Sequence, residues 1–435
     1  MHIATTLDVD QIPSLVVRFL GIIGPEPWIK RHRSLSQQML VNPLLTPYFE
    51  DCHSLELRLG RLLDESSSSS GLMTVDLADP QDYALLSFIA PMVLVFDQLT
   101  PLGQNRVAGI LRDGLNTDLR PFESEIETVT HLMAQGFDVT FQDIDRGRGF
   151  DFLAVKDGVE LEVECKSASG DLGRQVHRRR MIELSGHVQP VIKEALTSEG
   201  GRLVRVLLPG SLHGRREFLS EIAGNIRSVI RTERSVDTDQ CSVEFRAFDL
   251  ARSPFGSADP AAVTMDAVRT FLERETGNSN HHVFFGYRPG KVAVVFLVES
   301  RKPDRVVRGL MHDLKTSARA QFTKRRPGVL VVQFLELTTA ELLNVASHDS
   351  SERSRASAIQ IATNLFFDNP DRGHIHTLVY RAQGTLGQSV SVGHERIERS
   401  YQEQGPTYGF KNPNHPLAGD PRYSLFGAKT LGPAG

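Results

Sequence analysis

A chain of 435 residues is long enough for two or three domains and at least one sizeable core. With 40% hydrophobic and 23% charged residues and a formal net charge of −4, the composition excludes a globally basic nucleic-acid coat, whereas a local basic groove stays compatible with it. The three widely spaced cysteines argue against a disulfide framework and a cysteine zinc site, so we expect a reducing, cytoplasmic setting.

Residues 1–118 are predicted to form a mainly helical region. Apolar residues recur at helical spacing around Leu15 and Phe19, and again from Leu55 to Leu63. The acidic N-terminus does not resemble a secretory signal, and the most apolar run, 84–96, is shorter than the ~20 residues that span a bilayer. We therefore expect no membrane partner. This region contains no recognisable catalytic or binding motif. Its role could be that of a scaffold, of a surface for a homodimer or a partner protein, or of a module that restricts substrate choice.

A new helix is predicted from Pro121 to its C′ residue Gly136. Its core stripe consists of Phe122, Ile126, Val129 and Met133. At about 100° per residue, Glu125 points toward this stripe, whereas Glu123 and Glu127 point away from it. Glu125 is therefore the acid that we expect to face inward.

The next feature is a predicted β-hairpin over residues 150–166, FDFLAVKDGVELEVECK. Asp157 and Gly158 favour a two-residue type I′ turn, because both central residues of that turn need positive φ. Counting outward from the turn places Asp151 opposite Glu164. A strand at 137–144 precedes this hairpin.

Side chains alternate between the two faces of the hairpin, and the apolar ones, Cys165 among them, form a core face. The opposite face carries Asp151, Glu160, Glu162, Glu164 and Lys166. Carboxylates that face each other roughly 5 Å apart repel. A divalent cation bound by oxygen ligands would hold them together. Glu162 is a rival ligand, and the alternative for the whole set is a solvated face.

The rest of the chain is predicted to alternate between helices and strands. After the hairpin we expect a helix at 173–196, a strand at 203–208, a helix at 217–230 and a strand at 242–250. Later we expect a strand at 292–298, a helix at 304–322, a strand at 329–335, helices at 339–346 and 355–366, and a hairpin at 375–392. This is an α/β pattern, whose later part either extends the first sheet or builds a second.

The predicted domains are 1–118, 119–252 and 280–395, followed by an irregular tail at 400–435. Four aromatic residues are expected to pin this tail: Tyr408, Phe410, Tyr423 and Phe426.

The order αβββαβ, with Glu125 on the first helix, Asp151 on the second strand and Glu164-Cys165-Lys166 on the third, resembles the PD-(D/E)XK nuclease superfamily. The resemblance covers residues 121–210, and Phe150 stands where the short motif has proline. It implies a restriction-endonuclease-like core within the α/β fold.

The resemblance also implies Mg²⁺-dependent hydrolysis of phosphodiester bonds in DNA, with Mn²⁺ able to substitute. Asp151 and Glu164 would hold the metal, with the backbone carbonyl of Cys165 as a third ligand. Lys166 would orient or deprotonate the attacking water and neutralise developing charge. Glu125 would bind a second metal, or the first one through water.

A basic cluster follows the hairpin at the start of the next predicted helix. It consists of Arg174, His177, Arg178, Arg179 and Arg180. Free N–H groups at a helix N-terminus suit phosphate, so we expect contacts with the nucleic-acid backbone, which position without reading sequence. A charged helix end is an equally good interpretation.

The sequence is also compatible with two other functions. One is a nuclease-fold protein that binds or assembles on nucleic acid without significant hydrolysis. The other is an interaction module in which the acidic hairpin is coincidental. Among nucleases, the sequence does not distinguish restriction, repair, recombination and defence.

Overall fold

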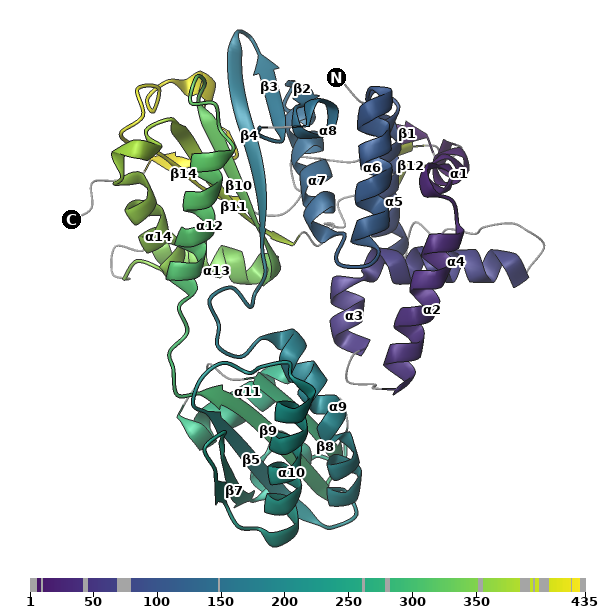
Figure 1. Ribbon diagram of the computed structural model, residues 1–435, viewed down its shortest axis with the longest axis vertical. Coiled ribbons are helices and arrows are strands. Elements are labelled where there is room, and N and C mark those ends of the chain that lie inside the picture. Colours follow the sequence, from purple (N-terminus) through teal and green to yellow (C-terminus); the bar gives the residue numbers. More distant parts are fainter. Residues whose placement is uncertain are drawn as a thin grey trace. The chain divides into compact units, whose positions relative to one another are not determined.

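The protein is represented by a computed structural model that describes residues 6–8, 11–41, 46–68, 80–147, 149–259, 263–277, 282–350, 355–383, 392–393, 396–398, 407–423 and 425–430 (Figure 1). The chain divides into two compact units. The larger unit comprises Met1–Gln37, Tyr48–Leu172 and Val306–Gly435, and the inserted unit comprises Gln38–Pro47 and Gly173–Arg305. The predicted domains 119–252 and 280–395 are each divided between these units.

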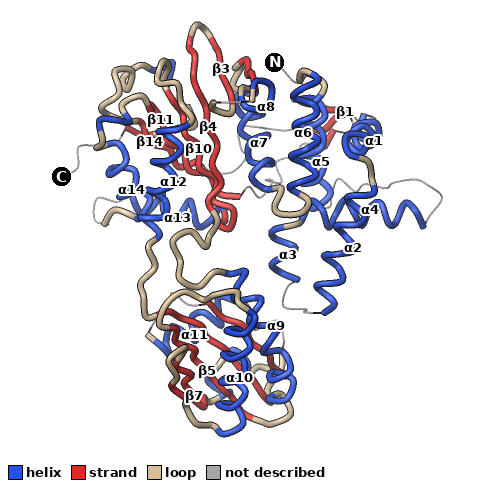
Figure 2. The backbone as a smooth tube through the Cα atoms, viewed as in Figure 1, coloured by secondary structure: helices blue, strands red, loops and turns tan. Residues whose placement is uncertain are grey.

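The larger unit combines helices with a mixed sheet (Figure 2). Its N-terminal helices are α1 (Ile12–Ile23), α2 (Glu26–Val41), α3 (Thr46–Cys52), α4 (Ser54–Ser68), α5 (Pro80–Phe96), α6 (Pro101–Gly114) and α7 (Arg120–Ala134). Its later helices are α8 (Asp143–Arg146), α12 (Val306–Ala320), α13 (Thr339–Asp349) and α14 (Ala358–Phe367), with short 3₁₀ turns at Pro370–Arg372 and Pro421–Tyr423. The region 1–118 is thus mainly helical, as predicted, and it also contributes strand β1 (Thr6–Asp8).

Seven strands form the sheet of the larger unit, in the order β15-β14-β11-β10-β4-β3-β2. They are β2 (Asp138–Phe141), β3 (Phe152–Lys156), β4 (Val159–Ala168), β10 (Gly328–Thr338), β11 (Ile375–Gln383), β14 (Thr407–Lys411) and β15 (Lys429–Thr430). β2, β3 and β4 are antiparallel neighbours, whereas β10 runs parallel to both β4 and β11.

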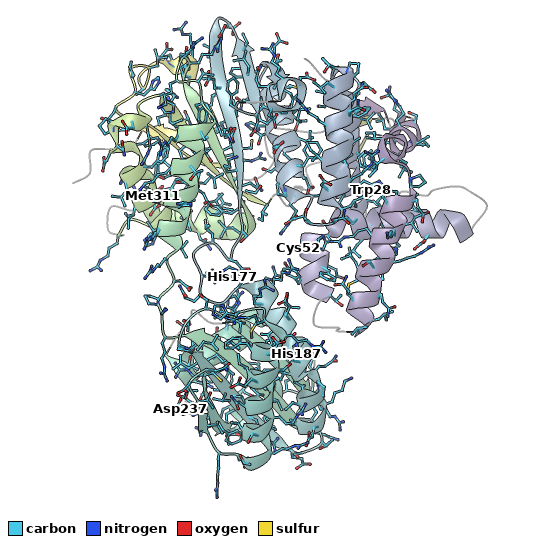
Figure 3. All side chains as sticks on the ribbon, viewed as in Figure 1. Trp28, Cys52, His177, His187, Asp237 and Met311 are labelled. Carbon is cyan, nitrogen blue, oxygen red and sulfur yellow. The ribbon has the colours of Figure 1, made fainter. Side chains whose placement is uncertain are left out.

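Each face of this sheet has its own hydrophobic core. One core joins the N-terminal helices and α7 to the face that carries Phe152, Val163 and Cys165. The other joins α12, α13 and α14 to the face that carries Leu330 and Tyr380. Figure 3 marks Trp28 and Cys52, both buried among the N-terminal helices. Because these helices share a core with the sheet, they are not a separate domain.

The prediction of the fourth strand of this sheet was wrong. The segment predicted at 203–208 forms β5 (Gly200–Leu208), which belongs to the sheet of the inserted unit. The parallel neighbour of β4 is β10, which follows α12 after the whole inserted unit. The local sequence pattern cannot tell whether β5 or β10 pairs with β4, because both strands are apolar and differ only in their distant pairing partners.

Two further predictions concern the C-terminal part. Residues 384–391 of the hairpin expected at 375–392 lie outside the described part of the chain; its first strand, β11, pairs with β10 on one side and β14 on the other. Farther along, β12 (Val392–Gly393) pairs with β13 (Arg396–Glu398), which also pairs with β1. The tail is not irregular throughout, since β14 and β15 join the main sheet. Its four pinning aromatic residues are buried, as predicted.

The inserted unit is an α/β layer structure with a five-stranded mixed sheet in the order β6-β7-β5-β9-β8. Beside β5, its strands are β6 (Val236–Asp237), β7 (Ser242–Phe248), β8 (His282–Arg288) and β9 (Val292–Ser300). Helices α9 (Arg178–Ala195) and α10 (Arg216–Thr232) cover one face. Helix α11 (Met265–Thr276) and the 3₁₀ turns Leu250–Arg252 and Pro254–Gly256 cover the other.

Within the described part of the chain, no helix is both long enough and apolar enough to cross a membrane.

Candidate active site

The predicted hairpin forms, and its register is as predicted from the turn to Phe152 and Val163; the predicted pair of Asp151 with Glu164 lies beyond the last pair of the ladder. Asp157 and Gly158 have φ of 49° and 75°, as a type I′ turn requires. Lys156 pairs with Val159, and the ladder continues as far as Phe152 with Val163. The hairpin therefore places Asp151 near the segment Glu164-Cys165-Lys166.

Asp151 directly precedes the first residue of β3. It therefore lies beside the part of β4 that extends beyond the last ladder pair. The N–H of Cys165 donates a hydrogen bond to Asp151 Oδ2 at 2.5 Å. The Cys165 side chain lies in the core, and burial raises the pKa of its thiol, which argues against a role as a nucleophile. Asp151 is thus fixed beside the Glu164-Cys165-Lys166 segment.

Glu164 and Lys166 form an ion pair, with 2.6 Å between Glu164 Oε1 and Lys166 Nζ. The Glu164 side chain is 1% exposed, whereas that of Lys166 is 36% exposed. The second carboxylate oxygen, Glu164 Oε2, is buried and accepts no hydrogen bond from an N–H or hydroxyl among the described residues; the Asp151 carboxyl can donate to Glu164 only when it is protonated. An unsatisfied buried acceptor of this kind is costly, and an unplaced ion is one of its ordinary explanations.

Helix α7 brings Glu125 to the same place. The helix ends at Ala134, and Gly136 has φ of +85°, so the predicted C′ glycine is confirmed. Burial, together with the charges of Asp143 and Glu164, raises the pKa of Glu125 to about 8. The charges of both acids act on Glu125, so it lies within electrostatic range of Asp143 and Glu164.

Asp143 belongs to this cluster but was missed in the sequence. It is the first residue of α8, and its Oδ1 accepts a hydrogen bond of 2.6 Å from the N–H of Ile144. Arg106 holds the same turn by donating to the carbonyl oxygens of both residues. The available signal was an acid at the end of the strand predicted at 137–144, eight residues before Asp151.

The four acids outnumber the one cation among them. Burial, followed by the charges of Glu164 and Glu125, raises the pKa of Asp151 to about 9. Burial also raises the pKa of Glu164 and of Asp143. Burial lowers the pKa of Lys166, but the neighbouring Glu164 outweighs it, so that this pKa lies above its ordinary value. The cluster therefore holds protons that a divalent cation would displace.

Glu162, the rival ligand, is engaged elsewhere. It is fully buried, and its two oxygens accept hydrogen bonds from the N–H and the hydroxyl of Thr323, in the loop before β10. Arg326 from the same loop lies 3.6 Å from Glu162 and also pairs with Glu160. The two acids next to the turn therefore anchor a loop and do not form a solvated face.

Glu127, one of the two acids predicted to point away from the core stripe of α7, also has a partner. Arg381 on β11 is 2% exposed and donates to Glu127 Oε2 at 3.3 Å and to Thr128 Oγ1 at 3.2 Å. This guanidinium ties α7 to the sheet just beyond Glu125. The partnership was invisible in the sequence because about 250 residues separate its members.

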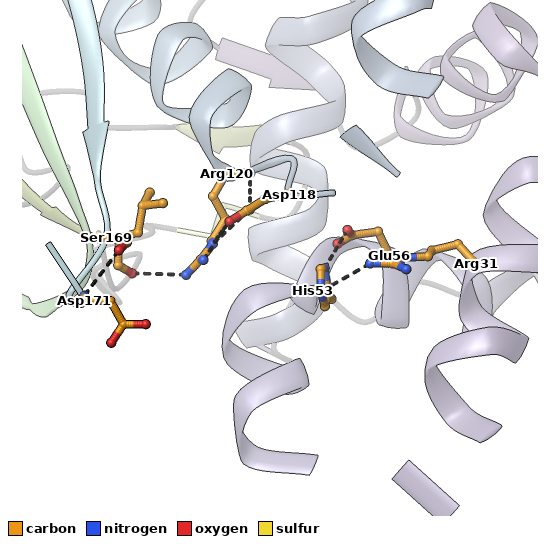
Figure 4. Close-up of polar contacts among 8 residues, drawn as sticks. Arg31, His53, Glu56, Asp118, Arg120, Ser169 and Asp171 are labelled. Atoms are coloured by element: carbon orange, nitrogen blue, oxygen red, sulfur yellow. Dashed lines mark hydrogen bonds and ion pairs between the residues drawn. The ribbon is translucent and has the colours of Figure 1, made fainter. Parts of the chain in front are cut away.

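A second polar cluster lies at the start of α7 and among the N-terminal helices (Figure 4). Arg120 pairs with Asp118 at 2.7 Å and donates to the carbonyl oxygen of Leu335 at 3.4 Å. A chain of contacts joins Arg31, His53 and Glu56, of which His53 and Glu56 are buried. Burial, with the charges of Glu127 and Glu56, raises the pKa of Glu123 to about 8.

The predicted phosphate-contacting cluster lies in the inserted unit. His177, labelled in Figure 3, is the N-cap of α9 and provides no side-chain cap. Arg179 and Arg180 pair with Glu183 at 3.4 and 2.7 Å. Arg174 is half-buried in the loop before the helix, where its carbonyl contacts the His177 ring. Part of the cluster's charge is therefore neutralised within α9.

The donor set fits a hard divalent cation. Asp151, Glu164 and Glu125 present carboxylate oxygens, the ligands that Mg²⁺ prefers, and one buried oxygen lacks a partner. Among the described residues, however, no three His, Cys, Asp or Glu side chains are arranged so that they could hold a metal ion together. Lys166 and the Cys165 N–H occupy one oxygen each of Glu164 and Asp151.

No protein-family model, no curated protein and no solved structure matches the chain. Function is therefore inferred from the residues of this chain and their arrangement.

Proposed function

We propose that the protein is a metal-dependent nuclease that hydrolyses phosphodiester bonds in DNA. The observation that carries the proposal is the buried cluster of Glu125, Asp143, Asp151 and Glu164 around Lys166, with an unpartnered oxygen on Glu164. Buried like charges are costly unless something compensates them. A bound cation that also contacts a substrate phosphate would do so.

The order of the elements supports a restriction-endonuclease-like core. Without the inserted unit and the single turn α8, the chain reads α7, β2, β3, β4, α12, β10, which is the αβββαβ order. In this order the antiparallel strands β2, β3 and β4 are followed by β10, which lies parallel beside β4. The proposal therefore moves the last helix and strand of the core from 173–208 to 306–338.

Each residue has a role in the proposed reaction. Asp151 and Glu164 would hold Mg²⁺ or Mn²⁺, with the carbonyl of Cys165 as the third ligand and Glu125 as an accessory one. The cation would activate water and stabilise negative charge on the phosphoryl group. Lys166, paired with Glu164 Oε1, would orient or deprotonate the attacking water and neutralise charge that develops on the phosphoryl group.

The decisive experiment is a cleavage assay with single-stranded, double-stranded and branched DNA, and with RNA, in Mg²⁺, Mn²⁺ or EDTA. Wild-type protein should cut at least one DNA substrate only with metal. Lys166→Ala should lower the rate by at least about 100-fold while DNA binding persists.

Absence of metal-dependent cleavage on all substrates would remove the nuclease proposal. If the same protein still bound DNA, the alternative of a nucleic-acid-binding or assembly protein would replace it.

A further inference from the structure

Two adjoining hollows open at one end of the sheet of the inserted unit. The first, about 640 Å³, is lined by the loop after β5, the first turns of α10 and the turn before β7. The second, about 200 Å³, is lined by the end of β9 and the residues that follow it. Lys302 lines both. β5 and β9 are parallel, and crevices at the carboxyl ends of such strands are common ligand sites.

The first hollow has features that suit a phosphate group. The 17-residue helix α10 starts there, and its N-cap, Arg215, provides no side-chain cap. The Lys302 ammonium lies beside Gly210, where an added Cβ would be 3.7 Å from Nζ. Across the described ranges, neither Arg215 nor Lys302 forms an ion pair, so both cations are available to an anion.

Other groups in the hollows suit the remainder of a nucleotide. Phe218 and His213 line the first hollow, with ring centroids 5.6 Å apart, and offer faces for a base. Gln240 Oε1 is buried there without a hydrogen-bond partner. In the second hollow Glu299 is 5% exposed; Arg205 binds its Oε2 at 2.7 Å, and its Oε1 has no partner.

These features favour one ligand class over simple anions. The first hollow is also lined by Glu217, Glu221 and Asp239, which would repel a bare phosphate or a second anion. A ligand that carries amino and hydroxyl donors next to its phosphate would satisfy these acids and the two orphan oxygens. The volume lies within the range of roughly 300–1,000 Å³ that is usual for small-molecule sites.

We propose that these hollows form a nucleotide-binding site in the inserted unit. The phosphate lies at the start of α10 between Arg215 and Lys302. The base lies against Phe218 and His213, and a hydroxyl or amino group donates to Glu299. The nucleotide is either free in solution or the terminal nucleotide of a nucleic acid.

The site adjoins the two segments that connect the inserted unit to the rest of the chain. Asp304 lines the second hollow, and its Oδ1 accepts a hydrogen bond of 2.8 Å from the N–H of Gln175. The N–H of Arg305 donates to the carbonyl of Gly173 at 2.7 Å. A bound nucleotide therefore touches the joined connectors.

Calorimetric titration of the full-length Asp151→Asn protein tests the site without cleavage. The ligands are the four ribonucleoside 5′-monophosphates, the matching nucleosides, inorganic phosphate, and a short oligonucleotide with or without a 5′-phosphate. We expect at least one nucleotide to bind with Kd below about 1 mM, and its nucleoside to bind at least about tenfold more weakly. Binding by the free monophosphate indicates a soluble ligand, whereas binding of only the 5′-phosphorylated oligonucleotide indicates a nucleic-acid end.

The matched variants are the double substitution Arg215→Ala with Lys302→Ala, and Lys291→Ala at the opposite end of β9. The double variant should bind at least about tenfold more weakly, and Lys291→Ala should bind as the parent protein does. The proposal is overturned if no nucleotide or oligonucleotide binds, or if the double variant binds equally well. A protein that binds nucleotide but cuts no DNA would keep this site and lose the nuclease function.

Discussion

At Asp151, burial and three neighbouring acids all disfavour the ionised carboxylate. Its carboxylate is 7% exposed, lies among Glu125, Asp143 and Glu164, and is fixed by the N–H of Cys165. A side chain in such a position destabilises the metal-free fold, as residues kept for function often do. Its contribution to stability should therefore change sign when a cation binds.

Replacing Asp151 with Asn should stabilise the metal-free protein. The amide keeps an oxygen for the Cys165 N–H and avoids the free-energy cost of protonating, on folding, a carboxylate whose pKa in the folded protein is about 9. We expect the melting temperature in EDTA to rise by at least about 2 °C. Asp157→Asn in the exposed turn is the matched control and should change little, since Asn-Gly also suits a type I′ turn. A lower melting temperature for Asp151→Asn would contradict the repulsion.

Stability of the metal-free protein should fall with rising pH. Glu125 and Asp151 have pKa values of about 8 and about 9 in the folded protein, against ordinary values near 4. The folded state thus binds more protons than the unfolded chain, so this stabilisation is complete below about pH 4 and is lost progressively up to about pH 9. Urea unfolding in EDTA measures it. Saturating Mg²⁺ should flatten the slope, and a metal-free stability that rises between pH 6 and 9 would refute the assignment.

At the scale of elements, α7 and the β3–β4 hairpin set the geometry of the site. Their local features were predictable: the turn Asp157-Gly158, the ladder register and the C′ glycine of α7 all follow from short-range patterns. The partners that hold them were not. Glu162 binds a loop about 160 residues away, and Arg381 reaches α7 from β11, so neither contact has a local signature.

Arg381 should be a positioning residue for α7. Arg381→Met leaves Glu127 without its cation and should destabilise the protein by about 3–5 kcal/mol, the usual cost of breaking a buried pair. Glu127→Gln should cost at least as much, because it leaves the Arg381 guanidinium, which is only 2% exposed, without its counter-charge. In a double-mutant cycle followed by urea unfolding, the double variant should be more stable than the sum of the single effects predicts. Additive effects would show that the two side chains do not interact energetically.

At the scale of the whole molecule, an insertion divides the larger unit between β4 and α12. The sequence pattern located most of the longer helices and strands between residues 121 and 366 but missed α11, β8 and β14, and it assigned β5 to the wrong sheet. Both β5 and β10 are apolar strands that follow a helix, and only non-local pairing decides which one lies beside β4. Asp143 was missed for a related reason. It lies in the four-residue helix α8, which is too short to show a periodic pattern that would identify Asp143 as a site residue.

The inserted unit should fold by itself. It has its own cores on both sides of its sheet, and its two connectors are joined by the hydrogen bonds of Gly173 with Arg305 and of Gln175 with Asp304. Residues 173–305 expressed alone should show cooperative thermal unfolding by circular dichroism. The larger unit, with residues 174–304 replaced by a short Gly/Ser linker, should keep a melting temperature that rises with Mg²⁺. Loss of cooperative folding in both fragments would contradict the division into units.

The central claim is that Asp151, Glu164 and Lys166 form a metal-dependent hydrolytic site. The most direct test compares rates of DNA cleavage in Mg²⁺ for wild type, Asp151→Asn and the turn control Asp157→Asn, all at equal folded concentration. We predict that wild type and Asp157→Asn cut at similar rates and that Asp151→Asn is at least about 100-fold slower. Cleavage by Asp151→Asn at the wild-type rate would place the reaction elsewhere and contradict the account.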